Sequence, residues 1–169
     1  MRSTLFTVLA LIFCSQTIAQ TKDNTNGAGT IFDVEEVVGV CNIIREYGSA
    51  IDTPKQLAFV RDRHNISESD FFSHYIDQII CHQKHVLFMA LDSEFDDFMS
   101  IISTDKLKRL NRPLANLDGT KYTPVDYLFM KMKATTDKRI KGKYRVLIFK
   151  LKQLGYKTCS ELEAKDCKF

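Results

Sequence analysis

The stretch SESDFFSHYIDQIICHQKHVLFMAL, residues 67–91, decides the fold expected of this chain. It opens with Ser67-x-x-Asp70, a helix-start signal, and holds no glycine or proline that would end a helix. At about 100° per residue, its apolar side chains cover roughly half of a helix surface, wider than the stripe of a surface helix. The sequence therefore predicts one long central helix over residues 67–91, with Cys81 on its polar side.

Similar start signals divide the rest of the chain into further helices. They are Asp33-x-x-Glu36, Thr53-Pro54 with Gln56, Ser93-x-x-Asp96 leading toward Leu110, and Thr123-Pro124-x-Asp126 leading through Met132. The segment Lys143–Leu154 has a β-branched and aromatic core that a strand would also show, but no clear partner strand exists, so we expect a helix there. The predicted fold class is all-α, a secreted bundle of about six helices with two disulfides.

The first 19 residues have the form of a secretory signal peptide. Arg2 supplies the positive charge, Leu5–Phe13 is a short apolar run, and Thr17 and Ala19 are small residues before the cleavage point. A membrane span needs about 20 apolar residues, so this run is too short to remain in a bilayer. We expect cleavage before Gln20, a secreted extracellular protein and no transmembrane segment.

The remaining chain is organised as one domain. Residues 20–30 are polar with two glycines and no large apolar side chain, which predicts a flexible N-terminal arm. The length and composition predict that residues 31–169 form a single helical domain; the full sequence has 44% hydrophobic and 27% charged residues.

The cysteines of a secreted chain predict disulfides. Four remain after cleavage: Cys41, Cys81, Cys159 and Cys167. Ser160-x-x-Glu163 resembles a capping box, so a short helix is expected between the last two. Its rise of about 12 Å would hold their Cα atoms more than about 7 Å apart. We therefore expect two long-range disulfides that join the tail to Cys41 and Cys81, although a turn at this place would allow the local pair.

No metal or cofactor site is expected from the histidines. His82-x-x-His85 lacks a third nearby ligand, and His74 lies three helical turns from His85. Partly exposed structural histidines are the favoured interpretation. A pH-sensing patch is an alternative that nothing in the sequence selects.

The acidic cluster Asp92, Glu94, Asp96 and Asp97 lacks the spacing of a calcium loop. We expect it to mark a helix start, where carboxylates are favoured by the helix dipole. The chain also has no Gly-x-Ser-x-Gly elbow and no phosphate-binding glycine loop, so no catalytic residue is assigned.

Asn65-Ile66-Ser67 is an acceptor sequence for N-glycosylation. It precedes a helix start in a loop that is expected to be exposed. If the chain is secreted from a eukaryotic cell, we expect Asn65 to carry a glycan.

Charge is distributed unevenly along the chain. Residues 20–105 contain 6 Lys/Arg and 15 Asp/Glu, net −9, whereas residues 106–169 contain 17 and 6, net +11. The densest cations are Lys138, Arg139, Lys141, Lys143 and Arg145, and Gly142 among them predicts an exposed, flexible turn. Either the two halves pack against each other, or the basic half binds an anionic glycan, lipid or protein surface. Nucleic acid is not expected at an extracellular address.

Two binding functions compete, and an enzyme of unknown type is third. The favoured one is surface recognition of an extracellular protein or polyanion through the basic half. The alternative is a helical carrier of a small apolar ligand, lined by aromatic and methionine side chains. In general shape the expected fold is similar to small helical carriers of invertebrate secretions and to helical cytokines. The Cys-x-x-x-Cys pair of odorant-binding proteins is absent around Cys81, so no residue role is transferred, and the oligomeric state stays open.

Overall fold

A computed structural model describes residues 30–47, 52–93 and 95–167. The expected signal peptide and residues 20–29 of the expected arm lie outside the described residues. The helices are α1 (Val34–Asn42), α2 (Asp52–Arg63), α3 (Glu68–Asp70), α4 (Val86–Ser93), α5 (Phe95–Thr104), α6 (Pro124–Ala134) and α7 (Lys138–Gln153). The strands are β1 (Ile80–Cys81), β2 (Lys84–His85), β3 (Leu114–Ala115) and β4 (Lys121–Tyr122).

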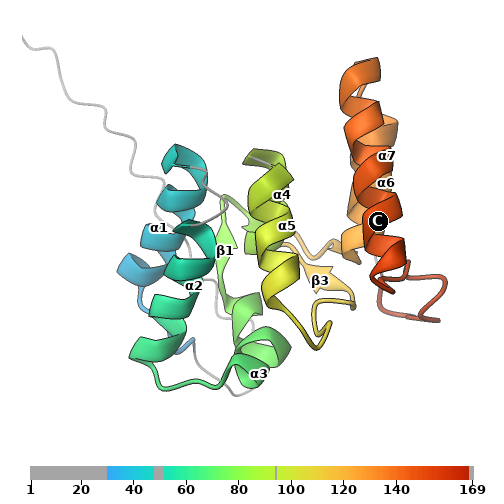
Figure 1. Ribbon diagram of the computed structural model, residues 1–169. Coiled ribbons are helices and arrows are strands. Elements are labelled where there is room, and N and C mark those ends of the chain that lie inside the picture. Colours follow the sequence, from blue (N-terminus) through green and yellow to red (C-terminus); the bar gives the residue numbers. More distant parts are fainter. Residues whose placement is uncertain (1–29, 48–51, 94, 168–169) are drawn as a thin grey trace, which may run out of the picture.

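The helix-rich architecture confirms the predicted class in outline, with two small antiparallel hairpins, β1–β2 and β3–β4, added to it. Figure 1 shows α1 and α2 at one end of the molecule, α4 and α5 in the middle, and α6 with α7 at the other end. One buried apolar cluster runs through all of these layers. Within the described ranges, no helix has both the length and the apolar character needed to cross a membrane.

The helix-start signals predicted the observed helix starts where the capping side chain bonds an amide three residues away. Asp33 and Glu36 form a reciprocal capping box before α1, and the Ser67 hydroxyl accepts a hydrogen bond from the Asp70 amide. Thr123 caps α6 in the same way, with a proline at the first helical position. α2 begins at Asp52, one residue before the expected start at Thr53.

The long helix expected over residues 67–91 is wrong, because the chain breaks near its middle. After α3 the backbone forms a π-helical turn (Phe71–Tyr75) and a 3-10 turn (Ile76–Gln78), and it then becomes extended at Ile79. β1 and β2 pair through a two-residue turn at 82–83, where φ is +48° and +68°. Positive φ at two non-glycine residues is unfavourable, so tertiary contacts must maintain this turn.

Tertiary contacts hold the chain on both sides of this turn: the Gln83 carbonyl accepts a 2.9 Å hydrogen bond from the Leu117 amide, and Cys81 is part of a disulfide. A continuous helix would put Cys81 on a polar face, whereas in β1 its side chain is only 1% exposed and is bonded to Cys41. The Cα atoms of the two cysteines are 5.4 Å apart. Burial of the disulfide against α1 therefore outweighs the helical periodicity of the surrounding sequence.

α5 ends at Thr104, earlier than the expected end near Leu110. The Asp105 side chain is buried and accepts a 2.6 Å hydrogen bond from the Leu110 amide. Lys108 between them adopts a φ of +54°. The chain therefore closes a compact turn here instead of a further helical turn.

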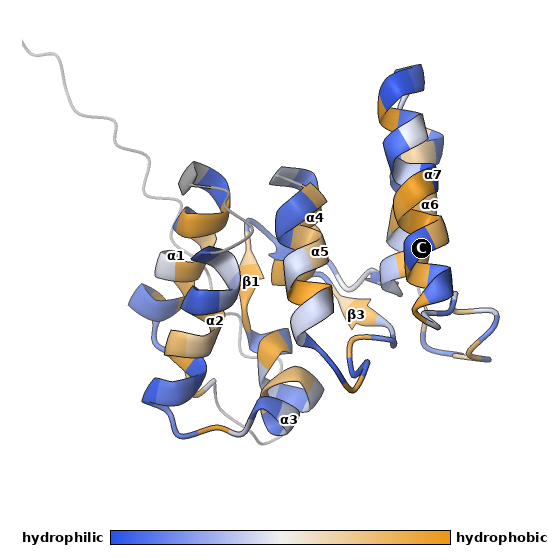
Figure 2. Cartoon of the chain, in the orientation of Figure 1, coloured by the Kyte–Doolittle hydropathy of each residue, from blue (hydrophilic) through white to orange (hydrophobic). Residues whose placement is uncertain are grey.

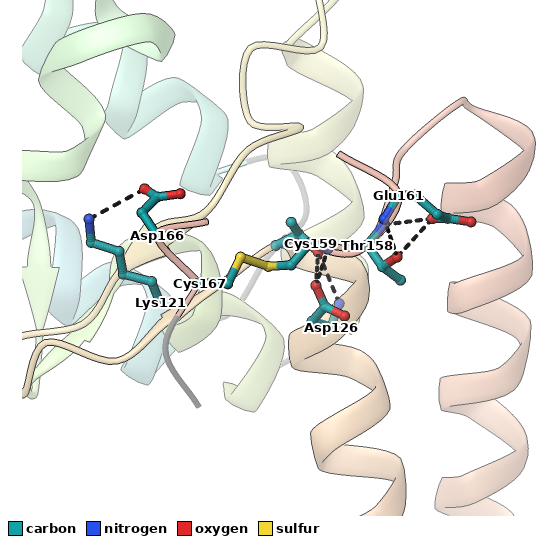
Figure 3. The surroundings of a disulfide bond; sticks show 8 residues. Lys121, Asp126, Thr158, Cys159, Glu161, Asp166 and Cys167 are labelled. Carbon is teal, nitrogen blue, oxygen red and sulfur yellow. Dashed lines mark hydrogen bonds and ion pairs between the residues drawn. A yellow bond between two sulfur atoms is a disulfide. The ribbon is translucent and has the colours of Figure 1, made fainter. Parts of the chain in front are cut away.

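The expected long-range disulfides from the tail are also wrong. Cys159 pairs with Cys167, with their Cα atoms 6.2 Å apart, and Cys41 pairs with Cys81. The segment between Cys159 and Cys167 forms turns in place of a helix, as the hydrogen bond from the Ala164 amide to the Cys159 carbonyl shows. Figure 3 shows this bridge beside Asp126, whose carboxylate accepts a hydrogen bond from the Cys159 amide.

The reciprocal cap in the tail lies two residues before the expected one. Thr158 and Glu161 bond each other's backbone amides with their side chains, as Ser160 and Glu163 were expected to do. This shift places Cys159 inside the turn and brings Cys167 within reach of it.

Candidate anion-binding surface

The cations predicted to bind anions all lie on α7. That helix runs from Lys138 to Gln153, so the flexible turn expected around Gly142 is wrong, while the helix expected over 143–154 is confirmed and starts earlier. The Asp137 carboxylate caps α7 by accepting hydrogen bonds from the Arg139 and Ile140 amides. The predicted anion-binding residues therefore have fixed helical positions.

α7 is amphipathic, and its apolar side faces α6. Tyr144, Leu147, Ile148 and Leu151 are buried at helical spacing, and α6 and α7 form an antiparallel helical hairpin. We call α6 and α7 together the basic hairpin. Lys138, Arg139, Lys143, Arg145 and Lys150 are exposed on its surface, and Lys141 is half-buried.

The charge of α7 is unbalanced. The helix carries no acidic side chain between Lys138 and Gln153. Its first residues are cations, although the N-terminal end of a helix dipole favours anions. Lys141 and Arg145 also lie four residues apart, a spacing at which like charges repel. A local arrangement that opposes helix stability in two ways is typical of residues retained for binding.

Pairing between the two halves of the chain neutralises little of this charge. Two ion pairs join a cation of residues 106–169 to an acid of the first half within the described ranges: Arg112 with Asp77, and Lys131 with Asp92. In the same ranges, none of the five predicted anion-binding cations has an ion-pair partner. Lys143 lies over the Phe95 ring instead, 5.1 Å from its centroid.

The basic hairpin is held on α4 by Asp92. Its carboxylate forms a 2.7 Å ion pair with Lys131, accepts a 3.0 Å hydrogen bond from the Tyr127 hydroxyl and contacts Lys84. Burial by itself would raise the pKa of Asp92, but its contacts with Lys131 and Lys84 hold that pKa below the ordinary carboxyl value. The Tyr127 ring stacks on Phe88 with 4.1 Å between centroids.

Asp92 corrects the expected role of the acidic cluster. It was expected at a helix start, but it lies in the last turn of α4, where the dipole disfavours an anion. The lysines around it supply the compensating charge. Asp96 and Asp97 lie in the first turn of α5, as expected of helix-start carboxylates.

A cleft of about 500 Å³ opens beside the start of α7. Arg139 and Lys143 line one side of it, but carboxylates from Asp92 and Asp137 line it as well. Its mixed charge makes it a poor enclosed anion pocket, so the outer surface of α7 is the better candidate. A second, apolar recess beside Phe71 holds only about 20 Å³, little more than one water molecule.

The three histidines of the 67–91 stretch separate in the structure. His74 and His82 are exposed, whereas His85 is completely buried, which corrects the expectation that it is partly exposed. Its Nδ1 accepts a hydrogen bond from the Leu87 amide, so its proton lies on Nε2, 3.2 Å from Asp77. Among the described residues, no group of three potential ligands is arranged to hold a metal ion.

The sequence interpretation missed the role of Arg112. Its guanidinium binds both oxygens of Asp77 at 2.8 Å. Burial by itself would raise the pKa of Asp77, but its contacts with His85 and Arg112 hold that pKa below the ordinary carboxyl value. This pair links two segments 35 residues apart in the chain, so no local pattern could have revealed it. It is a structural link and lies outside the basic hairpin.

Asn65 lies in the turn after α2, exposed and with a φ of +53°. Asparagine is one of the few residues that adopt this conformation readily. Its exposure leaves the acceptor sequence accessible, and glycosylation stays a prediction.

The chain matches no protein-family model, no curated protein and no solved structure. Its function must therefore be argued from its own residues.

Proposed function

We propose that this is a secreted binding protein that recognises an anionic extracellular partner through the basic hairpin. The observation that carries the proposal is the set of solvent-facing α7 cations without ion-pair partners among the described residues. The signal-peptide pattern and the two disulfides support an extracellular location.

The alternative explanation for the charge segregation is mutual neutralisation of the two halves. It would require the cations of α7 to lie against the acids of residues 20–105. Instead, α7 packs on α6 through its apolar side. Although Arg139 and Lys143 line a cleft with Asp92, none of the five predicted anion-binding cations forms an ion pair with an acid of those residues within the described ranges. Exposed cations near one another create a positive potential that attracts polyanions.

The test is retention on heparin, a sulfated polyanion, of the native chain and of a charge-reversal variant. The variant changes Lys138, Arg139, Lys141 and Lys143 to Glu. We expect the native chain to elute above physiological salt and the variant to lose retention, with an unchanged helical circular dichroism spectrum. The attraction should weaken as salt rises, because the screening length at physiological strength is about 8 Å and shortens further.

A matched variant controls for net charge. It reverses four exposed cations of the same half that lie outside the basic hairpin: Lys106, Lys108, Lys157 and Lys165. Its net charge equals that of the first variant, so its retention should stay close to native if the location of the charge matters. Equal loss in both variants, or native elution at or below physiological salt, would contradict the proposed function.

A further inference from the structure

The outward face of α7 carries two apolar side chains among its cations. Val146 is 54% exposed and Phe149 is 62% exposed. They lie on one ridge with Gly142 and Gln153, at i, i+4, i+7 and i+11, directly opposite the side that packs on α6. Figure 2 shows hydrophobic segments alternating with hydrophilic ones along α7.

Cations flank this ridge on both sides. At about 100° per residue, one flank is formed by Arg139, Lys143 and Lys150, and the other by Lys141, Arg145 and Lys152. Of these six, Lys152 is paired with Glu161 in the tail and Lys143 lies over the Phe95 ring. The ridge is therefore an apolar stripe with positive charge along both edges.

This combination distinguishes between anionic partners. A sulfated glycan offers negative charge but no apolar phase, so it would leave Phe149 and Val146 in water. An anionic phospholipid surface offers both, because an amphipathic helix can seat apolar side chains at the acyl boundary while lysine and arginine reach the phosphates. The basic hairpin stands at one end of the molecule, so α7 can approach such a surface (Figure 1).

We propose that α7 docks on anionic phospholipid surfaces, with Phe149 and Val146 seated at the acyl boundary and the flanking cations on the headgroup phosphates. The inference rests on the proposed function and specifies the partner. α7 would lie on the membrane without spanning it, consistent with its alternating apolar and charged residues.

A single tryptophan reports directly on this contact, because the chain contains none. Phe149→Trp places an indole on the stripe. Phe59→Trp is the matched control, since Phe59 is 59% exposed on α2 at the opposite end of the molecule. With vesicles of equal parts phosphatidylcholine and phosphatidylserine, we expect a blue shift at position 149 and none at position 59. Vesicles of phosphatidylcholine alone should give no shift at either position.

The affinity contribution of the stripe is tested by the double variant Val146→Ser, Phe149→Ser. Sedimentation with the mixed vesicles should show a loss of affinity of about tenfold or more, since apolar burial is removed while every cation stays. Heparin retention should be unchanged. Phe59→Ser, which removes an equally exposed phenylalanine, should bind the vesicles like the native chain.

The outcomes separate the two proposals. Native vesicle affinity in the double variant, or vesicle binding without a blue shift at position 149, would overturn lipid docking and leave a partner such as a glycan in its place. If the α7 charge-reversal variant binds both heparin and vesicles like the native chain, the proposed function fails as well.

Discussion

Reversing the charge at the start of α7 should stabilise the protein. In the double variant Lys138→Glu, Arg139→Glu, two cations at the positive end of the helix dipole become anions. Each exposed charge near a helix end contributes roughly 0.3–1 kcal/mol, and changing its sign counts this contribution twice. The new residue at 139 also lies four residues before Lys143, which converts a repulsive pair into an attractive one worth about 0.3–0.5 kcal/mol.

Because both residues are exposed, we use the lower end of this range. At low ionic strength, the contributions then raise the free energy of unfolding by about 1–2 kcal/mol. For a domain of this size, about 2–4 °C of melting temperature corresponds to each kcal/mol. Thermal unfolding followed by circular dichroism should therefore shift upward by roughly 3–6 °C. The shift should shrink at high salt, where surface charges are screened.

Lys150→Glu is the matched control for this prediction. Lys150 is exposed in the last turn of the same helix, where the dipole favours a cation, so its reversal should lower the melting temperature. A fall in stability on reversing Lys138 and Arg139, or a rise on reversing Lys150, would refute the dipole argument. It would also remove the reason for regarding the α7 cations as retained against stability.

Two further predictions concern the contacts that hold the fold. Asp92→Asn should destabilise the protein by about 1–3 kcal/mol, because Lys131 and Lys84 lose their counter-charge at a partly buried site. Since the pKa of Asp92 is lowered in the folded state, its stabilisation is present above the ordinary carboxyl pKa of about 3.9. Denaturant unfolding at several pH values should therefore show that the free energies of unfolding of the variant and of the native chain approach each other as the pH falls below that value. Removing the Cys41–Cys81 disulfide should cost about 4 kcal/mol and removing Cys159–Cys167 about 2.5 kcal/mol, because the first closes the longer loop. Equal melting temperatures of the two Cys→Ala double variants would contradict this order.

The sequence predicted those features of the fold that depend on interactions between residues close together in the chain. The caps at Asp33, Ser67 and Thr123 were recognisable because each bonds an amide three residues away. The break in residues 67–91 was not, because it depends on a disulfide to Cys41 and on a turn whose residues, His82 and Gln83, give no turn signal. Helical periodicity alone cannot show when a distant contact outweighs it.

The candidate surface was predictable in composition but not in shape. The five cations were identified from their density, yet Gly142 suggested a turn that would have left them without order. Once α7 is extended back to Lys138, helical geometry places Val146 and Phe149 between two cationic edges. The observation needed was which side of the helix is buried, and only the packing on α6 supplies it.

The acidic half of the chain has a consequence for how the molecule would meet an anionic surface. Residues 20–105 carry net −9 and residues 106–169 net +11. The acidic excess lies in residues 64–105, which contain eight acids and one lysine, whereas α1 and α2 together contain four acids and three cations. Near a negative surface, the basic hairpin is therefore attracted while the acids of residues 64–105 are repelled, so the charge distribution orients the molecule before contact. Arg112 and Lys131 form the cross-half ion pairs described above and leave the basic hairpin with a large positive charge. Although the overall net charge is small, the uneven distribution of charge thus turns the apolar stripe of α7 toward the surface that it is proposed to bind.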